Sequence, residues 1–294
     1  MVSGTTQNLG VIGWPIAHSL SPAMQNAAIR EAGLDFSYIA MPVEPGRLRQ
    51  AVEGLRSLGF RGFNVTIPHK TAVMELLDEV SPDARRIGAV NTVVNDGGKL
   101  VGYNTDVDGF LDGLSEAGVA VSGRHVSVLG AGGAARAVLC GLLREGAASV
   151  AVGVRNEEKA RRMLSDIVEP GRVTIVSWAS DVWREALREA SLLINTTPLG
   201  MTPHTEEMPP VDWSCVDPSA VVYDIIYTPY RTAFLRGAEA RGHKVLNGVP
   251  MLVGQGAVAL ARWTGIRPDK KAMEQALLTA LGMADIGPGT DGAS

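Results

Sequence analysis

Residues 126–138, which read VSVLGAGGAARAV, constrain the fold of this chain more than any other stretch. Val126 to Leu129 has the apolar character of a buried strand, and a cluster of glycine and alanine residues then breaks the pattern. The apolar residues between Ala134 and Leu142 predict a helix directly after the turn. A strand, a glycine-rich turn and a helix in this order are typical of the first unit of a dinucleotide-binding domain.

The small residues of this turn suit a phosphate-binding role. Gly130 permits a tight turn, and Gly132 lacks the Cβ that would hold the backbone away from a pyrophosphate group. The helix that follows presents free N–H groups and the positive end of its dipole to an anion. We therefore predict that a cofactor lies against Gly130, Ala131, Gly132, Gly133 and Ala134. On this stretch alone a plain connecting turn is the alternative, because such turns are common in α/β proteins.

Arg155 directly follows the strand predicted at 149–154, and this residue bears on the choice of cofactor. An NAD-binding domain usually carries Asp or Glu near this point, where the carboxylate receives the ribose 2′-hydroxyl. Arg155 instead offers a planar cation that suits a 2′-phosphate. Asn156 follows as the predicted N-cap of a helix that extends through Ile167. The pattern predicts NADP(H) rather than NAD, with a solvated strand-end cation as the alternative explanation of Arg155.

The composition bears on the domain count and excludes several classes of partner. The chain has 294 residues, 46% of them hydrophobic, which indicates one large or two medium globular domains. A net charge of −4 provides no basic surface for a nucleic acid. No apolar run reaches the ~18 residues that a transmembrane helix needs, and residues 1–10 do not form a secretory signal. Cys140 and Cys215 have no metal-site or redox-pair spacing, so we expect no metal and a reducing, cytoplasmic location.

The first part of the chain predicts an α/β unit of its own. Strands, including those of a hairpin, are expected at 9–12, 37–41, 63–67, 89–95 and 100–103. Ser21 is the predicted N-cap of a helix that has Pro22 at its first position. Lys70 is expected at the start of a short helix, where a cation opposes the helix dipole and therefore needs another reason.

Polar residues gather at the ends of these predicted strands and at the starts of helices. They are Ser19, Ser21, Thr66, Lys70, Asn91, Asn104 and Asp106. Because strand ends in α/β proteins converge on one crevice, we expect these side chains to line a substrate site. Several also have a purely structural explanation: Ser21 and Asp106 as helix caps, and Lys70 as a solvated cation.

A series of motifs, in the same order along the chain, resembles the shikimate dehydrogenase family. They are H-S-L-S-P (18–22), N-V-T-I-P-H-K (64–70), G-A-V-N-T (88–92), N-T-D (104–106), G-A-G-G-A-A-R-A (130–137), N-T-T-P-L-G-M (195–201), Y-D-I-I-Y-T-P (223–229) and N-G-V-P-M-L-V-G-Q (247–255). The match extends from about residue 9 to residue 282. It implies reversible, NADPH-dependent reduction of 3-dehydroshikimate to shikimate in aromatic amino-acid biosynthesis.

The resemblance implies a role for particular residues. Lys70 and Asp106 would be the catalytic pair beside the reacting oxygen, and Ser19 and Ser21 would bind the substrate carboxylate. The remaining substrate contacts would come from Thr66, Asn91, Tyr227 and Gln255. Further cofactor contacts would come from Arg155, Asn156, Thr196, Ile225 and Gly248. The chemistry agrees, because a lysine ammonium can stabilise the oxyanion that hydride delivery leaves on a ketone and can donate its proton.

The resemblance also implies a division into two α/β domains. Residues 1–106, completed by helices within 247–283, would form the substrate-binding and catalytic domain. Residues 107–246 would form a Rossmann-like NADP-binding domain with a doubly wound parallel sheet, and residues 284–294 a flexible tail. The small-molecule substrate is the expected partner, and the chain is expected to be a monomer or a homodimer.

Three other functions stay open at this point. The first is a dual shikimate/quinate dehydrogenase, which the sequence does not separate from a strict shikimate enzyme. The second is a catalytically silent NADP-binding sensor, against which the presence of both Lys70 and Asp106 argues. The third is a two-domain folate dehydrogenase, which would not need the serines at 19 and 21. One departure from the family is Val154 in place of its usual Asn, which could blur the preference for NADP over NAD.

Overall fold

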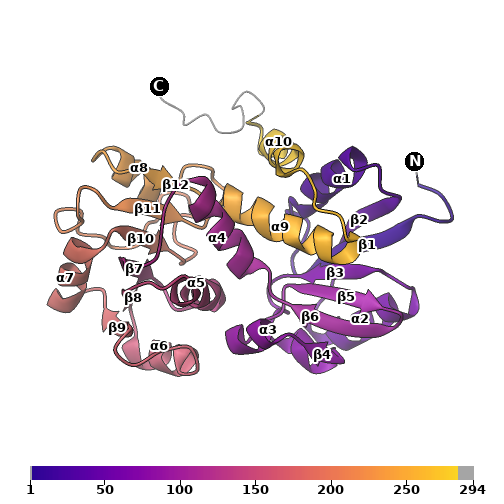
Figure 1. Cartoon of the computed structure of the whole chain (residues 1–294), viewed down its shortest axis with the longest axis horizontal. Coiled ribbons are helices and arrows are strands. Elements are labelled where there is room, and N and C mark those ends of the chain that lie inside the picture. Colours follow the sequence, from indigo (N-terminus) through magenta and orange to yellow (C-terminus); the bar gives the residue numbers. More distant parts are fainter. Residues whose placement is uncertain (1, 284–294) are drawn as a thin grey trace. The chain divides into compact units, whose positions relative to one another are not determined.

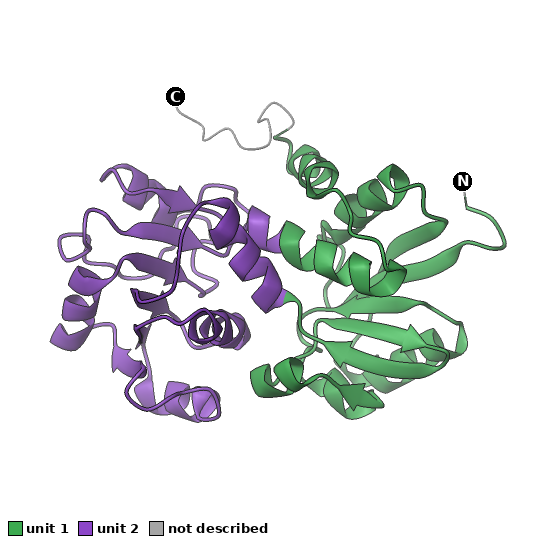
Figure 2. Cartoon of the chain, in the orientation of Figure 1, with its two compact units in different colours: residues 1–105, 253–294 green, residues 106–252 purple. Residues whose placement is uncertain are grey.

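The computed structural model describes residues 2–283, so the tail predicted at 284–294 lies outside the described residues. The chain divides into two compact units (Figure 2). Unit 1 combines residues 1–105 with residues 253–294, and unit 2 consists of residues 106–252. The second crossing between the units falls inside one helix, α9 (Val249–Thr264), so the chain enters unit 1 again along a continuous helical backbone.

Unit 1 is built on a mixed sheet of six strands in the order β2-β1-β3-β5-β6-β4. Its elements before α9 are β1 (Gln7–Gly13), α1 (Ser21–Glu31), β2 (Phe36–Pro42), η1 (Pro45–Arg47), α2 (Leu48–Ser57), β3 (Gly62–Val65), η2 (Ala72–Leu76), β4 (Glu79–Val80), α3 (Pro82–Ile87), β5 (Thr92–Asp96) and β6 (Lys99–Tyr103). The last helix of the unit is α10 (Lys270–Ala280), which packs against α1.

The strand directions of unit 1 bring several chain segments to one edge of its sheet. β1 and β3 are parallel, so both carboxyl ends lie at this edge. β5 runs antiparallel to β3 and β6 antiparallel to β5, so β5 begins and β6 ends at the same edge. The core on one face includes Val52 and Leu55 of α2 packed against Phe63, Val65 and Leu100 of the sheet.

Unit 2 is built on an all-parallel sheet in the order β12-β11-β10-β7-β8-β9 (Figure 1). Its elements are α4 (Asp106–Glu116), β7 (His125–Leu129), α5 (Gly133–Arg144), β8 (Ser149–Val154), α6 (Glu157–Leu164), β9 (Val173–Ser177), α7 (Asp181–Glu189), β10 (Leu192–Asn195), β11 (Val221–Asp224), α8 (Ala233–Glu239) and β12 (Val245–Leu246). The strand order reverses between β7 and β10, as in the doubly wound dinucleotide-binding fold. The predicted α/β class with a Rossmann-like unit is confirmed.

Two local predictions in unit 1 are wrong. Ser21 is not an N-cap: α1 begins at Ser21, its N-cap is Leu20, and no side chain caps it. Lys70 does not begin an α-helix, because it lies in a turn before η2, a 3-10 helix of 5 residues. Such a short segment has a small dipole, so the argument from an unfavourable cation at a helix start no longer applies to Lys70.

None of the helices among the described residues is long and apolar enough to cross a membrane.

Candidate active site

The loops after β1 and β3 lie side by side at the common edge of the unit 1 sheet. The backbone N–H of Thr66 donates to the carbonyl of Ile12 at 2.9 Å, and that of Trp14 donates to Ile67 at 3.1 Å. The first loop leads to Ser19 and Ser21, and the second leads to Lys70. The structure therefore brings the predicted carboxylate-binding serines to the same edge of the sheet as Thr66 and Lys70.

Asn91 joins this group from the start of β5. Its backbone carbonyl accepts a hydrogen bond from Val65 N at 2.8 Å, and the carbonyl of Lys70 accepts one from Val90 N at 2.8 Å. The segments that carry Lys70 and Asn91 are thus held together by their backbones. Asn91 is buried, and its side-chain oxygen accepts from Thr105 N at 2.8 Å. A polar set of several strand ends at one edge is the arrangement expected of a binding site in an α/β unit.

A buried chain of hydrogen bonds runs beneath these residues, and the sequence alone did not reveal it. The hydroxyl of Tyr38 donates to Asn64 Oδ1 at 2.7 Å, and Asn64 Nδ2 donates to Thr92 Oγ1 and to the carbonyl of Asn91, both at 3.0 Å. Thr92 Oγ1 donates to Asn91 Oδ1 at 3.0 Å. Burial raises the pKa of Tyr38, and a hydrogen bond from the Ser21 side chain opposes that rise. The network therefore connects Tyr38 with Asn91 through the interior.

Gln255 is the predicted substrate residue of unit 1 that comes from the far end of the chain. It lies on the part of α9 that belongs to unit 1 and is half-buried. The neighbouring Gly256 carbonyl accepts a hydrogen bond from Gln25 Nε2 of α1 at 3.0 Å. A Cβ on Gly256 would lie 2.4 Å from the end of Met24, so the two helices are in close contact here. This contact fixes α9 beside the helix that begins at Ser21.

Asp106 and Tyr227 belong to unit 2. Asp106 is the first residue of α4 and directly follows Thr105, where the first segment of unit 1 ends. Tyr227 follows β11 and is half-buried, and burial raises the pKa of its phenol. Their roles beside Lys70 remain predictions.

The glycine turn of unit 2 has the geometry that the sequence predicts for a pyrophosphate site. Gly130 has a φ of 100°, a conformation that favours glycine. Gly132 is the N-cap of α5 and supplies no side-chain acceptor, so the first N–H groups of the helix remain available to an anion. A Cβ on Gly132 or Gly133 would have no described atom within 4 Å. The space and the donors fit a dinucleotide pyrophosphate.

Arg155 and Asn156 follow β8, the strand beside β7 in the sheet. Arg155 is exposed, and the structure gives it no ion-pair partner among residues 2–283. An exposed, unpaired guanidinium at this strand end fits a ribose 2′-phosphate. Asn156 is the N-cap of α6, as predicted, and its Oδ1 accepts from Lys159 N at 2.9 Å. Its side chain is thereby committed to the helix, so any cofactor contact of Asn156 would use its remaining amide donors.

Thr196, Ile225 and Gly248 lie at the carboxyl ends of β10, β11 and β12. The Thr196 hydroxyl donates to the carbonyl of Leu129 at 2.7 Å, directly before the glycine turn. Gly248 N donates to Ile226 O at 2.9 Å, and a Cβ on Gly248 would lie 2.1 Å from the Ile225 carbonyl. Only glycine fits that approach. The glycine turn and the loops of Thr196, Ile225 and Gly248 therefore contact one another.

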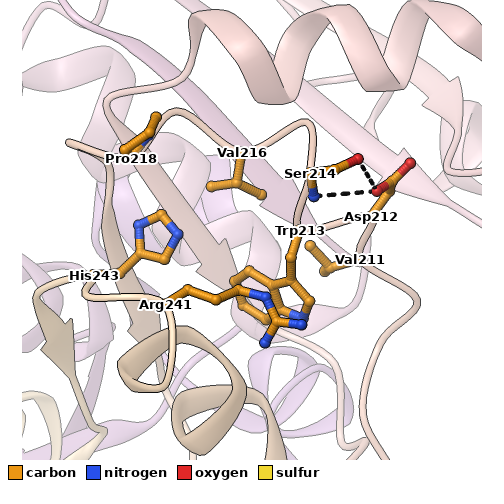
Figure 3. A pocket seen from close by; sticks show the side chains of 8 residues that line it. All are labelled: Val211, Asp212, Trp213, Ser214, Val216, Pro218, Arg241 and His243. Atoms are coloured by element: carbon orange, nitrogen blue, oxygen red, sulfur yellow. Dashed lines mark hydrogen bonds between the residues drawn. The ribbon is translucent and has the colours of Figure 1, made fainter.

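A hollow in unit 2 carries no part of this site. The hollow, of about 580 Å³, is lined by Val211, Asp212, Trp213, Ser214, Val216, Pro218, Arg241 and His243 (Figure 3). The Arg241 guanidinium lies over the Trp213 ring, 5.5 Å from its centroid, and no predicted site residue lines the hollow. Within the described part of the chain, no group of three or more His, Cys, Asp or Glu side chains could hold a metal ion.

The fold and the site define a class: α/β proteins in which a mixed-sheet unit with a polar edge accompanies a Rossmann-like unit with a glycine turn. Comparison with known proteins narrows this class. Residues 11–93 match the family model described as the shikimate dehydrogenase substrate binding domain, and residues 248–278 match that of the shikimate 5′-dehydrogenase C-terminal domain.

Whole-chain relatives agree with these models. The chain is 47% identical to shikimate dehydrogenase (NADP(+)) of Symbiobacterium thermophilum, over 95% of this chain and 96% of that protein. Shikimate 5-dehydrogenase from Thermus thermophilus, solved in complex with NADP(H) and shikimate, superimposes with a TM-score of 0.84 at 40% identity, covering 94% of this chain and 100% of that one. Quinate dehydrogenase from Corynebacterium glutamicum, solved in complex with NAD, superimposes with a TM-score of 0.84 at 32% identity, covering 93% of this chain and 99% of that one. The chain belongs to the shikimate dehydrogenase family.

Proposed function

We propose that the chain catalyses the reversible, NADPH-dependent reduction of 3-dehydroshikimate to shikimate, a step of aromatic amino-acid biosynthesis. The observation that carries the proposal is the pairing, in one chain, of a polar sheet edge with a glycine turn that leaves room for a pyrophosphate. The membership of the family and the NADP(H) and shikimate complex of the Thermus thermophilus relative support it.

The substrate would be held at the edge of the unit 1 sheet. The hydroxyls of Ser19 and Ser21 would donate to its carboxylate, and Thr66, Asn91 and Gln255 would contact the ring and its hydroxyls. Tyr227 would complete the substrate site from unit 2. Because Asn91 is already fixed by Thr105 and Thr92, its amide would meet the substrate in a preset orientation. Preorganised donors of this kind favour one binding pose.

Lys70 and Asp106 would perform the proton transfer. The bound NADPH would supply the hydride. The Lys70 ammonium would stabilise the negative charge that develops on the substrate oxygen and would donate the proton that this oxygen requires. The Asp106 carboxylate would keep the ammonium charged and directed at the oxygen. In the reverse direction, Lys70 would accept the proton from the substrate hydroxyl.

The NADPH would lie across the carboxyl ends of the unit 2 strands. The N–H groups at Gly132, Gly133 and Ala134 would bind the pyrophosphate, and Arg155 would bind the 2′-phosphate. Thr196, Ile225 and Gly248 would contact the nicotinamide end. Val154 stands where the family usually has Asn, so Arg155 would carry most of the discrimination against NAD.

A steady-state assay of the purified protein tests this proposal. We expect oxidation of shikimate with NADP, measured as NADPH absorbance, at a kcat/KM well above that with NAD. Lys70→Met keeps most of the side-chain volume but removes the charge and the proton, so kcat should fall by about 10²–10⁴-fold. The melting temperature and the NADPH affinity of this variant should match the parent. A folded Lys70→Met protein that turns over within about threefold of the parent would remove Lys70 from the catalytic step.

Quinate oxidation is the second candidate function, favoured by the quinate dehydrogenase at 32% identity. The same assay with quinate decides between a strict and a dual enzyme. We further propose that the chain works in the cytoplasm as a monomer or a homodimer with small molecules as its partners, in line with its two cysteines, which lack the spacing of a redox pair.

A further inference from the structure

Asp224, the last residue of β11, is a charged side chain that the proposed chemistry does not use. It is fully buried, and its carboxylate accepts three hydrogen bonds. Oδ1 accepts from Asn195 Nδ2 and from Ile226 N, both at 3.1 Å, and Oδ2 accepts from Thr232 Oγ1 at 2.6 Å. Asn195 is the last residue of β10 and lies opposite Asp224 in the parallel pair. The carboxylate therefore ties together the ends of two neighbouring strands.

The partners of Asp224 extend this connection into the predicted cofactor loops. Asn195 Oδ1 accepts from the backbone N–H of Thr197 at 2.9 Å and from its hydroxyl at 2.7 Å, which folds the loop that contains Thr196. A Cβ on Gly130 would lie 2.9 Å from both Thr196 Oγ1 and Thr197 Cγ2. The position of the 196–197 backbone is thus coupled to the glycine turn by direct contact.

The other side of Asp224 leads to the nicotinamide end. Its hydrogen bond to Ile226 N fixes the backbone that carries Ile225, and Ile226 O in turn accepts from Gly248 N at 2.9 Å. Thr232, the third donor, is also the N-cap of α8, where its Oγ1 accepts from Leu235 N at 3.3 Å. The carboxylate is therefore hydrogen-bonded to the direct chain neighbours of Thr196 and Ile225. Through Ile226 it is also connected to Gly248.

The free-energy cost of burying this carboxylate indicates that it has a role beyond stability. Burying a charge costs free energy even when the charge is hydrogen-bonded, and replacing a complete buried ion pair, both partners included, by apolar groups is often neutral or stabilising. Burial raises the pKa of Asp224 to about 6, although hydrogen bonds from Thr232, Ile226 and Asn195 oppose the rise. A carboxylate has two oxygens that can accept from three separate segments at once, which no apolar side chain can do.

We infer that Asp224 is a positioning residue for the dinucleotide: its carboxylate holds the loops of Thr196, Ile225 and Gly248 in the arrangement that receives NADP(H). The inference rests on the proposed function for the identity of the cofactor. The inference concerns the binding of NADP(H) and not the chemical step, so the inference and the proposed function can fail separately.

The test is NADPH affinity, measured by fluorescence titration without substrate, together with both Michaelis constants. Asp224→Ala removes both acceptor oxygens and with them all three hydrogen bonds, and we expect NADPH affinity to fall by about tenfold or more. The KM for shikimate should stay within about twofold. Asp224→Asn keeps a carbonyl oxygen for Asn195 and Ile226 and should bind NADPH within about threefold of the parent. A merely structural role would instead lower the melting temperature and the active fraction while leaving NADPH affinity unchanged.

Two further variants keep the inference testable if Asp224→Ala does not fold. Asn195→Ala cuts the same connection from β10 while Asp224 retains Ile226 and Thr232, and it should also weaken NADPH by about tenfold. Asp217→Ala is the matched control: its carboxylate accepts from Ser219 N and Oγ in a loop before β11, and its NADPH affinity should be unchanged. A folded Asp224→Ala or Asn195→Ala protein with parental NADPH affinity overturns the inference. If the variants lose NADPH but the parent does not oxidise shikimate, the proposed function fails and the positioning role stands.

Discussion

Two fully buried tyrosines, Tyr38 and Tyr223, offer a sharp test of the hydrogen-bond network in unit 1. The Tyr38 hydroxyl donates to Asn64 Oδ1 at 2.7 Å. The Tyr223 hydroxyl has no hydrogen-bond partner among the residues that the structure describes. Phenylalanine removes one oxygen atom from each site, so the two substitutions change volume equally and differ only in the bond that is lost.

We expect the two variants to change the free energy of unfolding differently. Tyr38→Phe leaves the buried Asn64 Oδ1 without its donor, and a buried polar atom without a partner costs about 1–3 kcal/mol. Tyr223→Phe removes a hydroxyl whose burial is uncompensated, so the folded state should be unchanged or stabilised by up to about 1–3 kcal/mol. The shifts should therefore have opposite signs, or Tyr223→Phe should be near zero.

Urea unfolding followed by circular dichroism measures both shifts as changes in the midpoint at constant m-value. Tyr38→Phe should also raise the KM for shikimate, because the network that positions Asn91 loses its first hydroxyl, while NADPH affinity stays within about twofold. If Tyr38→Phe and Tyr223→Phe destabilise the protein by the same amount, loss of packing explains both results and the network has no separate effect.

The remaining predictions concern the cofactor, the substrate and pH. Arg155→Asp should weaken NADP binding roughly 10- to 150-fold, because a charged hydrogen bond is worth about 1.5–3 kcal/mol; parental affinity in a titration would place the 2′-phosphate elsewhere. Ser19→Ala with Ser21→Ala should raise the KM for shikimate far more than that for NADP, and equal increases would indicate a folding defect. Burial raises the pKa of Asp224 from 3.8 to about 6, so the folded state favours the protonated carboxyl. The contribution of Asp224 to the free energy of unfolding is therefore complete below pH 3.8 and is lost as pH rises through 6. Asp224→Asn should abolish this pH-dependent loss, which amounts to about 3 kcal/mol. Parallel curves of stability against pH for variant and parent would contradict the prediction.

The motifs that could be found from the sequence are those whose parts lie close together along the chain. The glycine turn after β7 and the Asn156 cap of α6 depend on residues within one strand-turn-helix segment. Local spacing therefore predicted both correctly. The strand-end rule also gathered Thr66, Lys70 and Asn91 at one edge, since it uses only strand direction and order.

Local reasoning failed at two helix boundaries of unit 1. Ser21 looks like an N-cap because Pro22 follows it, yet the helix begins one residue earlier, at Ser21 itself. Lys70 looked like a helix-start cation, but the segment after it forms only a short 3-10 helix. In both cases the predicted boundary is off by one or two residues, which is the scale on which helix ends vary.

Tyr38 and Asp224 show why the supporting residues are harder to find than the ligands. Tyr38 and Tyr223 both stand in apolar strands, and only partners from other strands separate a bonded hydroxyl from an unbonded one. Asp224 is a polar residue at the end of an apolar strand. Such a residue indicates either a turn or a buried carboxylate whose desolvation the fold must offset. The offset comes from Asn195 and Thr232, which reach Asp224 from β10 and from the start of α8. A polar residue at the last position of a buried parallel strand is therefore the signal to use, because such strand ends lie where this fold binds its ligand.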